Sequence, residues 1–396
     1  MQNANVSISG DISYEKPIVP LDFIFEETSA NTGEVIDYIG TDRNIVIPSS
    51  YSIAIVDGEE VFIEGDDYTV TAIADGTNSS TGVFFGDNLT SVVFPDTIEK
   101  IGDYAFYGNN TLGSFNLDEL DNLIEIGNYA FNACSALQST LSLPSSLEII
   151  GARAFYNCRS LRGDLTIPAG VTTIEAQTFY YCSNLSSVTI GENVQSIGGY
   201  AFFYCTDIED ISYNAVSVED LTRQSNVFYC AGVENSGITV VFGEGVTRVP
   251  AYLFYGASNS SPPAITSVTF SSTITEIGNC SFYNSVDLVE IIFNCIELND
   301  FTENSAFYHA GYYTNGVTVI FNEGVTRIPA LMFETNYLGG TGRVHLSSVI
   351  FATTITEIGV GAFCGVGYLT GELVLPTNLE SIGDGAFNYC GYNSVT

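Results

Sequence analysis

Few residues of this chain have the chemistry of a catalytic or metal site, and their spacing does not assemble one. The two histidines, His309 and His345, lack a Cys, Ser or acid at a spacing typical of a triad or a metal site. The acidic runs DGEE and EGDD near residues 58–67 could bind calcium, but neither has the ligand spacing of a calcium-binding loop. The sequence therefore predicts no enzyme activity, no metal site and no cofactor.

The cysteines indicate packing rather than chemistry. There are nine, too few for a disulfide framework in a chain of 396 residues, and none form a CxxC pair typical of zinc sites. Reduced, buried thiols are the simplest interpretation, which weakly disfavours an oxidising compartment. Five of them lie three residues after a recurring phenylalanine: Cys134, Cys158, Cys182, Cys205 and Cys390.

Aromatic residues that directly follow the recurring phenylalanine could carry recognition. If the phenylalanine points inward, its neighbour points outward, and stacked rings would form a ribbon suited to sugar rings or partner side chains. The alternative is that the rings cover the turn and staple adjacent repeats. The column is Tyr107, Tyr156, Tyr180, Phe203, Tyr229, Tyr255, Tyr283 and Tyr308.

A second candidate column lies on predicted strands. Outward positions beside the Val of a V-x-I motif would form a hydroxyl and carboxylate face, suited to polar contacts with a protein or glycan. Short polar residues are also common on any exposed strand, so this alternative stays open. The acidic members are Asp164, Asp210, Glu290 and Glu372.

A phrase of about two dozen residues positions all these side chains. It reads approximately I-x-x-I-G-x-x-A-F-x-x-C-x-x-L-x-x-V-x-I-P, and such repeats must stack on one another to bury their apolar faces. Its landmark is a phenylalanine that recurs at intervals of 23 to 30 residues. The landmarks are Phe106, Phe131, Phe155, Phe179, Phe202, Phe228, Phe254, Phe282, Phe307, Phe333, Phe363 and Phe387.

Each part of the phrase predicts a local structure. The Gly of I-x-x-I-G permits a tight corner or a positive φ. The A-F-x-x-C part has roughly helical spacing but is too short for more than a turn or two. The L-x-x-V-x-I-P part alternates like a short strand and ends at Pro95, Pro144, Pro168 or Pro376. We expect a repeat solenoid, with short parallel strands stacked along one side and short helical turns or loops on the other.

The phrase also predicts the organisation of the chain. Residues 1–40 lack it and are expected to form an N-terminal cap or attachment segment with a strand or two. The solenoid spans 41–396 and is degenerate at about 51–84, where turns or an insertion are expected. A three-coil block is duplicated within about 212–370, because GITVVFGEGVTRVPAYLF and GVTVIFNEGVTRIPALMF agree at 12 of 18 positions. In that block Pro250 and Pro329 replace the corner Gly.

The repeated phrase resembles the BspA-like, or Treponema-type, leucine-rich repeat over about residues 40 to 390. The entry phrase DYIGTDRNIVIPSS is also similar to the usual start of such arrays. The resemblance implies an extracellular binding or adhesion role on a cell surface, without enzyme activity. No signal peptide is visible in MQNANVSISGDISYEKPIVP.

The charge of the chain limits its partners. Ten Lys and Arg stand against 46 Asp and Glu, which gives a net charge of -36. Such a field repels nucleic acid and anionic lipid, and no apolar run has membrane-spanning length. The chain stops at GAFNYCGYNSVT, before the expected strand of a last coil, so we expect an open end that docks on a partner or another copy, or continues into further chain.

Two functional hypotheses follow. The first is a non-enzymatic adhesion module whose long repeated surface contacts a protein or carbohydrate on a host or neighbouring cell. The second is a structural component of a virion or surface assembly, such as a fibre or decoration protein. The expected location is accordingly extracellular, at a cell surface or a virion surface.

Overall fold

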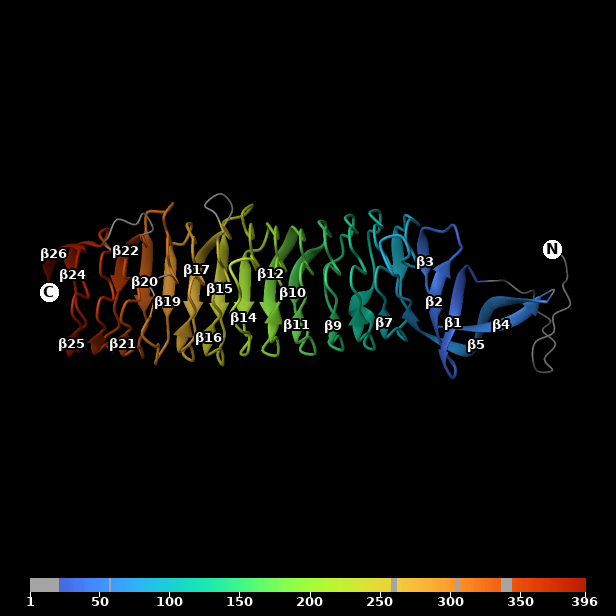
Figure 1. The fold of residues 1–396 in the computed structure, drawn as a ribbon, viewed down its shortest axis with the longest axis horizontal. Helices are drawn as coiled ribbons and strands as arrows, with labels where there is room; N and C mark the ends of the chain where they lie inside the picture. Colours follow the sequence, from blue (N-terminus) through green and yellow to red (C-terminus); the bar gives the residue numbers. More distant parts are fainter. Residues whose placement is uncertain (1–20, 57, 258–261, 303–305, 336–343) are drawn as a thin grey trace. The chain divides into compact units, whose positions relative to one another are not determined.

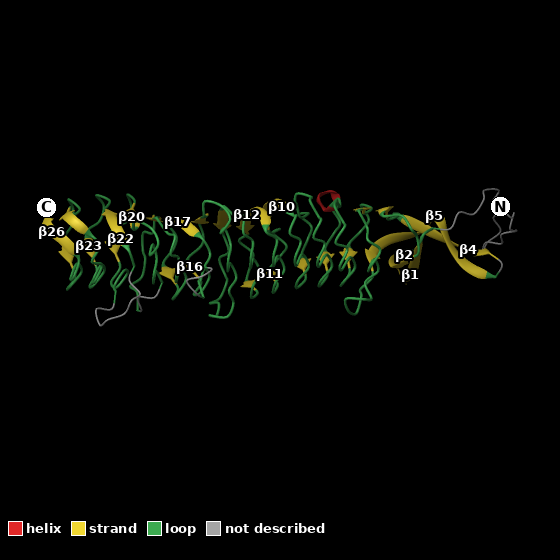
Figure 2. Cartoon of the chain, turned by 90° about the horizontal axis from the view of Figure 1, so that it is seen from above, coloured by secondary structure: helices red, strands yellow, loops and turns green. Residues whose placement is uncertain are grey.

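The chain winds into successive coils, and its strands are short. The computed structural model describes residues 21–56, 58–257, 262–302, 306–335 and 344–396. Two compact units are present, Met1–Arg162 with Pro168–Val171, and Gly163–Ile167 with Thr172–Thr396. Among the described residues the only helix is the 3-10 turn η1 (Leu117–Glu119). Figure 2 shows that loops and turns make up most of each coil.

The first unit begins with two antiparallel hairpins that lead into the coils (Figure 1). β1 (Phe23–Ser29) pairs with β2 (Thr32–Tyr38), and these are the strands predicted within residues 1–40. Residues 1–20 of that predicted segment lie outside the described residues. β2 then pairs in parallel with β5 (Glu59–Ile73), which also forms a hairpin with β4 (Ser50–Val56).

The degenerate segment contains an inserted hairpin, which is one of the two alternatives expected there, and the run Gly65–Asp67 does not form a separate turn. These residues lie inside β5, where the register passes from Ser52↔Ile63 to Tyr51↔Tyr68, so the intervening residues form a bulge. The first unit continues with short parallel strands stacked on β5 or beside it: β3 (Asn44–Val46), β6 (Ser91–Val93), β7 (Lys100–Ile101), β8 (Glu125–Ile126) and β9 (Ile149–Ile150).

The second unit is built on an eight-stranded sheet in which successive coils contribute neighbouring strands, paired in parallel wherever the register is defined. This arrangement confirms the predicted fold class. The strands are β10 (Arg162–Thr166), β12 (Asn184–Ile190), β14 (Asp210–Tyr213), β15 (Ile238–Phe242), β17 (Ile265–Phe270), β19 (Glu290–Phe293), β20 (Val317–Phe321) and β22 (Leu346–Ile350).

Two-residue strands form a second row in the same unit, separate from the sheet (Figure 1). They are β11 (Thr173–Ile174), β13 (Ser196–Ile197), β16 (Arg248–Val249), β18 (Glu276–Ile277), β21 (Arg327–Ile328), β23 (Glu357–Ile358) and β25 (Ser381–Ile382). The row is interrupted twice, since β13 does not pair with β16 and β18 does not pair with β21. The coils at the two interruptions belong to the duplicated block.

The landmark phenylalanines form the interior, as predicted. Eleven of the twelve are buried, and only the last, Phe387, is partly exposed. Most successive rings stack nearly parallel within each unit, with centroids 5.2 Å apart for Phe106 and Phe131 and 5.4 Å for Phe179 and Phe202, while Phe307 and Phe333 are tilted by 37°. Phe84, in the degenerate segment, also joins this stack at 4.6 Å from Phe106. A ring of the stack thus precedes Phe106, the first landmark phenylalanine.

The turn around each landmark phenylalanine is not helical. The residue two before it and the residue two after it are commonly left-handed, as at Tyr104 (φ 57) and Gly108 (φ 77) around Phe106. Alternate backbone N–H groups then donate to the next coil, with Tyr104 N to Asn128 O and Phe106 N to Ala130 O both 2.8 Å. The helical turn that the spacing allowed is replaced by this intercoil ladder.

The corner glycines are required by close approach rather than by positive φ. A Cβ on Gly359 would lie 2.4 Å from the backbone nitrogen of Ala330 in the preceding coil, and Gly278 has the same relation to Ala251. Neither glycine has a positive φ. Pro250 and Pro329 replace this glycine only where the preceding coil lacks the two-residue strand.

The last coil does contain a strand. The prediction that the chain stops before the strand of its last coil is therefore wrong. β24 (Thr370–Leu373) pairs in parallel with β26 (Gly391–Val395), as each coil of the larger sheet pairs with the next. The strands predicted to end at proline do end shortly before Pro95, Pro168 and Pro376, whereas only an isolated bridge at Thr140 precedes Pro144.

Candidate binding surfaces

The histidines do not meet in a common site in this structure. The Nδ1 atom of His309 lies 2.8 Å from Oδ1 of Asn284, and Nδ1 of His345 lies 3.2 Å from the carbonyl oxygen of Gly311. No group of three or more His, Cys, Asp or Glu side chains within the described ranges is arranged to hold a metal ion. The acidic run EGDD forms the bulge of β5.

The cysteine column has a hydrogen-bonding role that spacing alone did not indicate. Cys134, Cys158, Cys182 and Cys205 are buried and reduced, which confirms the predicted slot, while Cys390 is partly exposed. The thiol of Cys158 donates to the carbonyl of Phe131 at 3.1 Å, and that of Cys205 donates to Phe179 at 3.2 Å. Burial raises the pKa of Cys158 to about 12, so its thiol stays protonated and unreactive at neutral pH.

The predicted aromatic column exists, but its rings cover one another. Tyr180 stacks on Phe203 with centroids 4.7 Å apart and an interplanar angle of 7°, and Phe203 stacks on Tyr229 at 4.9 Å and 10°. Tyr283 and Tyr308 form the same arrangement at 4.7 Å. Stacked rings hide their faces and leave their edges to solvent, whereas a sugar ring binds to a ring face.

One member of the column departs from the predicted outward position. Tyr255 is only 4% exposed, and its hydroxyl accepts a hydrogen bond from Nε of Arg223 at 2.7 Å. The prediction that this ring points outward is therefore wrong. Tyr107 and Tyr156 are half-buried, and the position between them in the column is filled by Asn132, which is buried. The column is thus broken by an amide in the first unit.

The left-handed turn positions carry further aromatic columns that the sequence interpretation missed. Tyr104 stacks on Tyr129 at 4.6 Å and 6°, and Tyr181 stacks on Tyr204 at 4.6 Å and 15°. Next to Tyr129, Nη1 of Arg153 donates to its hydroxyl at 2.5 Å, and the guanidinium lies 5.2 Å from the ring centroid. The signal was available as tyrosines two residues before or two after the landmark phenylalanine.

The exposed face of the eight-stranded sheet brings the second predicted column into register. Asp210 and Glu290 belong to one row of register neighbours that crosses the sheet. The side chains of this row were predicted to point outward, and they are exposed or half-buried. Asp164 lies at the start of the sheet and accepts hydrogen bonds from the hydroxyls of Ser186 and Ser187 at 2.9 and 2.8 Å. The column is Ser187, Asp210, Thr239, Ser267, Glu290, Thr318 and Ser348.

Glu372, the fourth predicted acid, is not part of this sheet. It lies on β24, where its register neighbour is Ser394 of β26. Two residues beyond each member of the column stands a second outward column, which changes in character along the sheet. It is Thr189, Ser212, Val241, Thr269, Ile292, Ile320 and Ile350.

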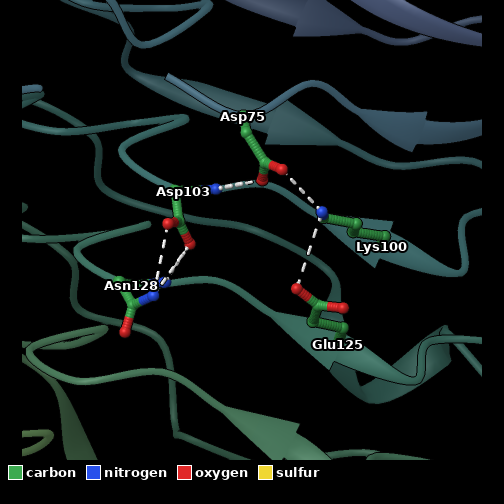
Figure 3. Close-up of polar contacts among 5 residues, drawn as sticks. All are labelled: Asp75, Lys100, Asp103, Glu125 and Asn128. Carbon is green, nitrogen blue, oxygen red and sulfur yellow. Dashed lines mark hydrogen bonds and ion pairs between the residues drawn. The ribbon is translucent and has the colours of Figure 1, made fainter. Parts of the chain in front are cut away.

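Cations clamp neighbouring coils at the row of two-residue strands. In the first unit Nζ of Lys100 lies 2.8 Å from Asp75 and 3.6 Å from Glu125 (Figure 3). Arg248 lies between Asp220 and Glu276 in the same way, and Arg327 between Asp300 and Glu357. Each cation thus bridges acids of the coil before and the coil after its own.

Side chains at the same corner also cap the backbone of the next coil. Oδ1 of Asp75 accepts the N–H of Asp103 at 2.8 Å, the carboxylate of Asp103 accepts the N–H of Asn128 at 2.5 Å, and Oδ1 of Asn128 accepts the N–H of Ala152 at 2.9 Å. Figure 3 shows the first two steps of this relay beside Lys100. Asp75 and Asp103 are therefore structural.

An open cavity of about 300 Å³ lies beside Arg248 in the second unit. It is lined in part by residues 299–302, in a coil that has no two-residue strand among its described residues. Its carboxylates already have partners, because Asp220 and Glu276 pair with Arg248, and Asp300 pairs with Arg327. The cavity is thus a gap in the ladder whose charges are satisfied within the chain.

Stacked coils, parallel strands and an almost complete lack of helix define a leucine-rich-repeat solenoid. The chain belongs to the family described as BspA type leucine rich repeat region, whose pattern matches residues 77–209, 126–261, 224–340 and 341–396. This confirms the resemblance in the repeated phrase. Membership suggests a protein-interaction or surface-adhesion role, and such proteins are typically binding proteins rather than enzymes.

Several solved structures are similar. A leucine-rich repeat protein from Bacteroides ovatus is 22% identical, covers 95% of this chain and 92% of its own, and gives a TM-score of 0.47. A leucine rich cell surface protein from Faecalibacterium prausnitzii is 22% identical, with coverages of 96% and 95% and a TM-score of 0.41. The T. pallidum leucine rich repeat protein is 24% identical, with coverages of 54% and 87% and a TM-score of 0.43. A comparison with curated proteins gives no match. No helix in the described part of the chain is long and apolar enough to cross a membrane.

Proposed function

We propose that this chain is a non-enzymatic adhesion module that binds a protein ligand through the exposed face of the eight-stranded sheet. The observation that carries the proposal is the pair of outward columns, which stand in register over seven strands. They place a polar row beside a partly apolar row on one face, an arrangement compatible with the apolar core and polar rim of a protein interface.

The aromatic columns favour a protein ligand over a glycan. Sugar recognition by aromatic residues uses ring faces, but Tyr180, Phe203 and Tyr229 bury their faces against one another. What these residues present to solvent is a line of ring edges. The sheet face is therefore the better candidate for the ligand, and the aromatic columns are better explained as links between coils.

Binding to intact cells tests this proposal. Fluorescently labelled chain would be applied to bacterial and epithelial cells and measured by flow cytometry, with cells pretreated by protease or by periodate. We expect binding that is lost after protease treatment and retained after periodate, and that falls at least fivefold in the face variant Asp210→Lys/Thr239→Lys. Binding that survives protease but not periodate, or that is unchanged in the face variant, would contradict the proposal.

The location of the native chain separates adhesion from the structural alternative. We expect it at the surface of a cell, where brief proteolysis of intact cells would release its fragments into the medium. Recovery of the chain only within purified viral particles or detached surface assemblies would instead favour a fibre or decoration protein. Mass spectrometry of both fractions makes the distinction.

A further inference from the structure

One side of the sheet face carries an apolar stripe. Along the last five strands of the eight-stranded sheet, the second outward column consists of consecutive register neighbours, of which four are β-branched apolar residues. Val241 is 41% exposed and Ile350 is 53% exposed. We call these residues the apolar stripe: Val241, Thr269, Ile292, Ile320 and Ile350.

Strand formation alone does not explain the stripe. At the same column position, the two preceding strands carry Thr189 and Ser212, and the stripe itself contains Thr269. A threonine has the β-branched shape that suits a strand and does not expose an apolar surface. Three isoleucines and a valine at five neighbouring positions, with exposed residues at both ends of the stripe, are typical of a contact surface.

The spacing of the stripe fits one kind of partner. Adjacent strands lie about 4.8 Å apart, so five strands span about 19 Å at right angles to their own direction. Apolar residues on one face of an α-helix recur every 4.5 to 6 Å along its axis, roughly the same spacing, and about 13 helical residues cover that length. An extended peptide would repeat its same-face side chains only every ~6.8 Å. A helix laid along the stripe matches it better.

Carboxylates border the stripe on both sides. Glu290 stands in the first outward column, two residues before Ile292, and Glu244 and Glu323 follow three residues after Val241 and Ile320. Glu244 accepts a hydrogen bond from the hydroxyl of Ser272 at 2.8 Å, and Glu323 accepts one from that of Thr353 at 3.0 Å. These bonds hold the two carboxylates in place at the end of the strands.

The cations near this face are already engaged. Among the described residues of the second unit, Arg248 and Arg327 are each held between two carboxylates, and Arg223 donates to Tyr255. No Lys or Arg within the described ranges forms an ion pair with Glu244, Glu290 or Glu323, and the net charge of the chain is -36. A second copy of this chain would be repelled, whereas a basic partner would be attracted.

We infer that the apolar stripe and its three bordering carboxylates dock a basic amphipathic helix of a partner protein. The helix lays its apolar row on the isoleucines and directs lysines or arginines to Glu244, Glu290 and Glu323. This inference rests on the proposed function and deepens it, because it names the chemistry of the protein ligand. It also locates that ligand on the last five strands of the sheet.

A designed peptide is the direct probe. A labelled peptide of about 14 residues, with leucines on one helical face and lysines on the other, would be titrated with the full chain by fluorescence anisotropy. A scrambled peptide of the same composition, without an apolar face, controls for charge alone. We expect the amphipathic peptide to bind at least tenfold more tightly than the scrambled one, and its affinity to fall as salt is raised. Equal affinities for the two peptides would overturn the inference.

Variants of the chain test whether the peptide binds at the apolar stripe. The double substitution Ile292→Thr/Ile320→Thr keeps β-branched strand residues and is expected to weaken the amphipathic peptide at least tenfold. The matched control is Val374→Thr, at an exposed valine just after β24, which should leave affinity unchanged. Glu244→Gln/Glu323→Gln should reduce the salt dependence. Circular dichroism melts of every variant would verify folding.

The outcomes separate this inference from the proposed function. If peptide binding is unaffected by Ile292→Thr/Ile320→Thr while binding to cells is still lost in Asp210→Lys/Thr239→Lys, the inference fails and the proposed function stands. Dimerisation of the full chain that the double variant abolishes, seen by sedimentation, would identify a second copy as the occupant and overturn the inference. If each variant kept the binding that it is expected to lose, both the inference and the proposed function would be overturned.

Discussion

Two sides of the same coils differ in what their side chains contact. On the turn side nearly every repeated side chain has its partner in the neighbouring coil: Phe106 stacks on Phe131, and the thiol of Cys158 donates to Phe131. On the sheet face, Asp210 and Ile350 stand in rows with their ends in solvent. Repetition on the turn side is therefore a requirement of stacking, whereas repetition on the sheet face is free to serve a ligand.

The charged corners lie between these extremes. Lys100 and Arg327 are exposed enough to meet a ligand, yet each is occupied by acids from two other coils. A stretch of acidic residues in the sequence can thus be a set of clamps and caps. Substitutions should consequently change stability on the turn side, change binding on the sheet face, and change stability weakly at the corners.

The largest effect is expected inside the turn. Phe155→Ala removes a ring that is fully buried and stacked on Phe131 at 5.5 Å, and should cost about 3 to 5 kcal/mol. Urea unfolding followed by tyrosine fluorescence would measure it, with Thr166→Ala on the sheet face as the control, expected within about 0.5 kcal/mol. Similar losses in the two variants would remove the distinction between the two sides.

The corner glycine should come next. Gly359→Ala places a Cβ 2.4 Å from the backbone of Ala330, and overpacking of this kind costs about 1 to 3 kcal/mol. Gly199→Ala is a matched control in the same unit, because its Cβ would meet nothing closer than 3.5 Å. Thermal melts of the two variants should differ clearly. A Gly359→Ala variant as stable as the control would show that the coils can separate at this corner.

The stacked tyrosines test most directly whether the turn side serves stability and the sheet face serves binding. Tyr180→Ser/Tyr229→Ser removes the two rings that stack face to face on Phe203, and we expect a loss of about 0.5 to 1.5 kcal/mol for each aromatic pair with little change in cell binding. Tyr180→Phe/Tyr229→Phe keeps the stack and removes only the hydroxyls. A variant of the second kind that stays stable but no longer binds cells would show that the ring edges contact the ligand.

The sequence correctly predicted the positions of the side chains that pack in the interior. A ring and a thiol at a fixed offset, as in Phe155 and Cys158, must meet their counterparts when coils stack, so the period alone placed them. The same offsets could have found the column of Tyr104, but not the left-handed turn that orients it, because that turn depends on which carbonyl of the next coil accepts each N–H. The apolar stripe was also missed, since register across five strands, not the pattern within one coil, aligns Val241 with Ile350.

The smallest effect is expected at a clamp. Asp300 is partly buried, which raises its pKa, but the N–H of Ala330 and the guanidinium of Arg327 outweigh this and lower the pKa below its usual value. A lowered pKa in the folded state means that the carboxylate stabilises the fold above about pH 4, and that this contribution is lost as the pH falls through the lowered value.

Asp300→Asn should therefore destabilise the chain at pH 7 by about 1 kcal/mol or less, as is usual for half-exposed ion pairs, and should match the wild type once the pH is below the lowered pKa of Asp300. Urea unfolding at several pH values would measure the difference, and a double-mutant cycle with Arg327→Gln isolates the pair from the backbone cap. A deficit that persists unchanged at acid pH would mean that shape, rather than charge, is what Asp300 contributes. The clamp would then resemble the turn side, where the packing of side chains determines stability.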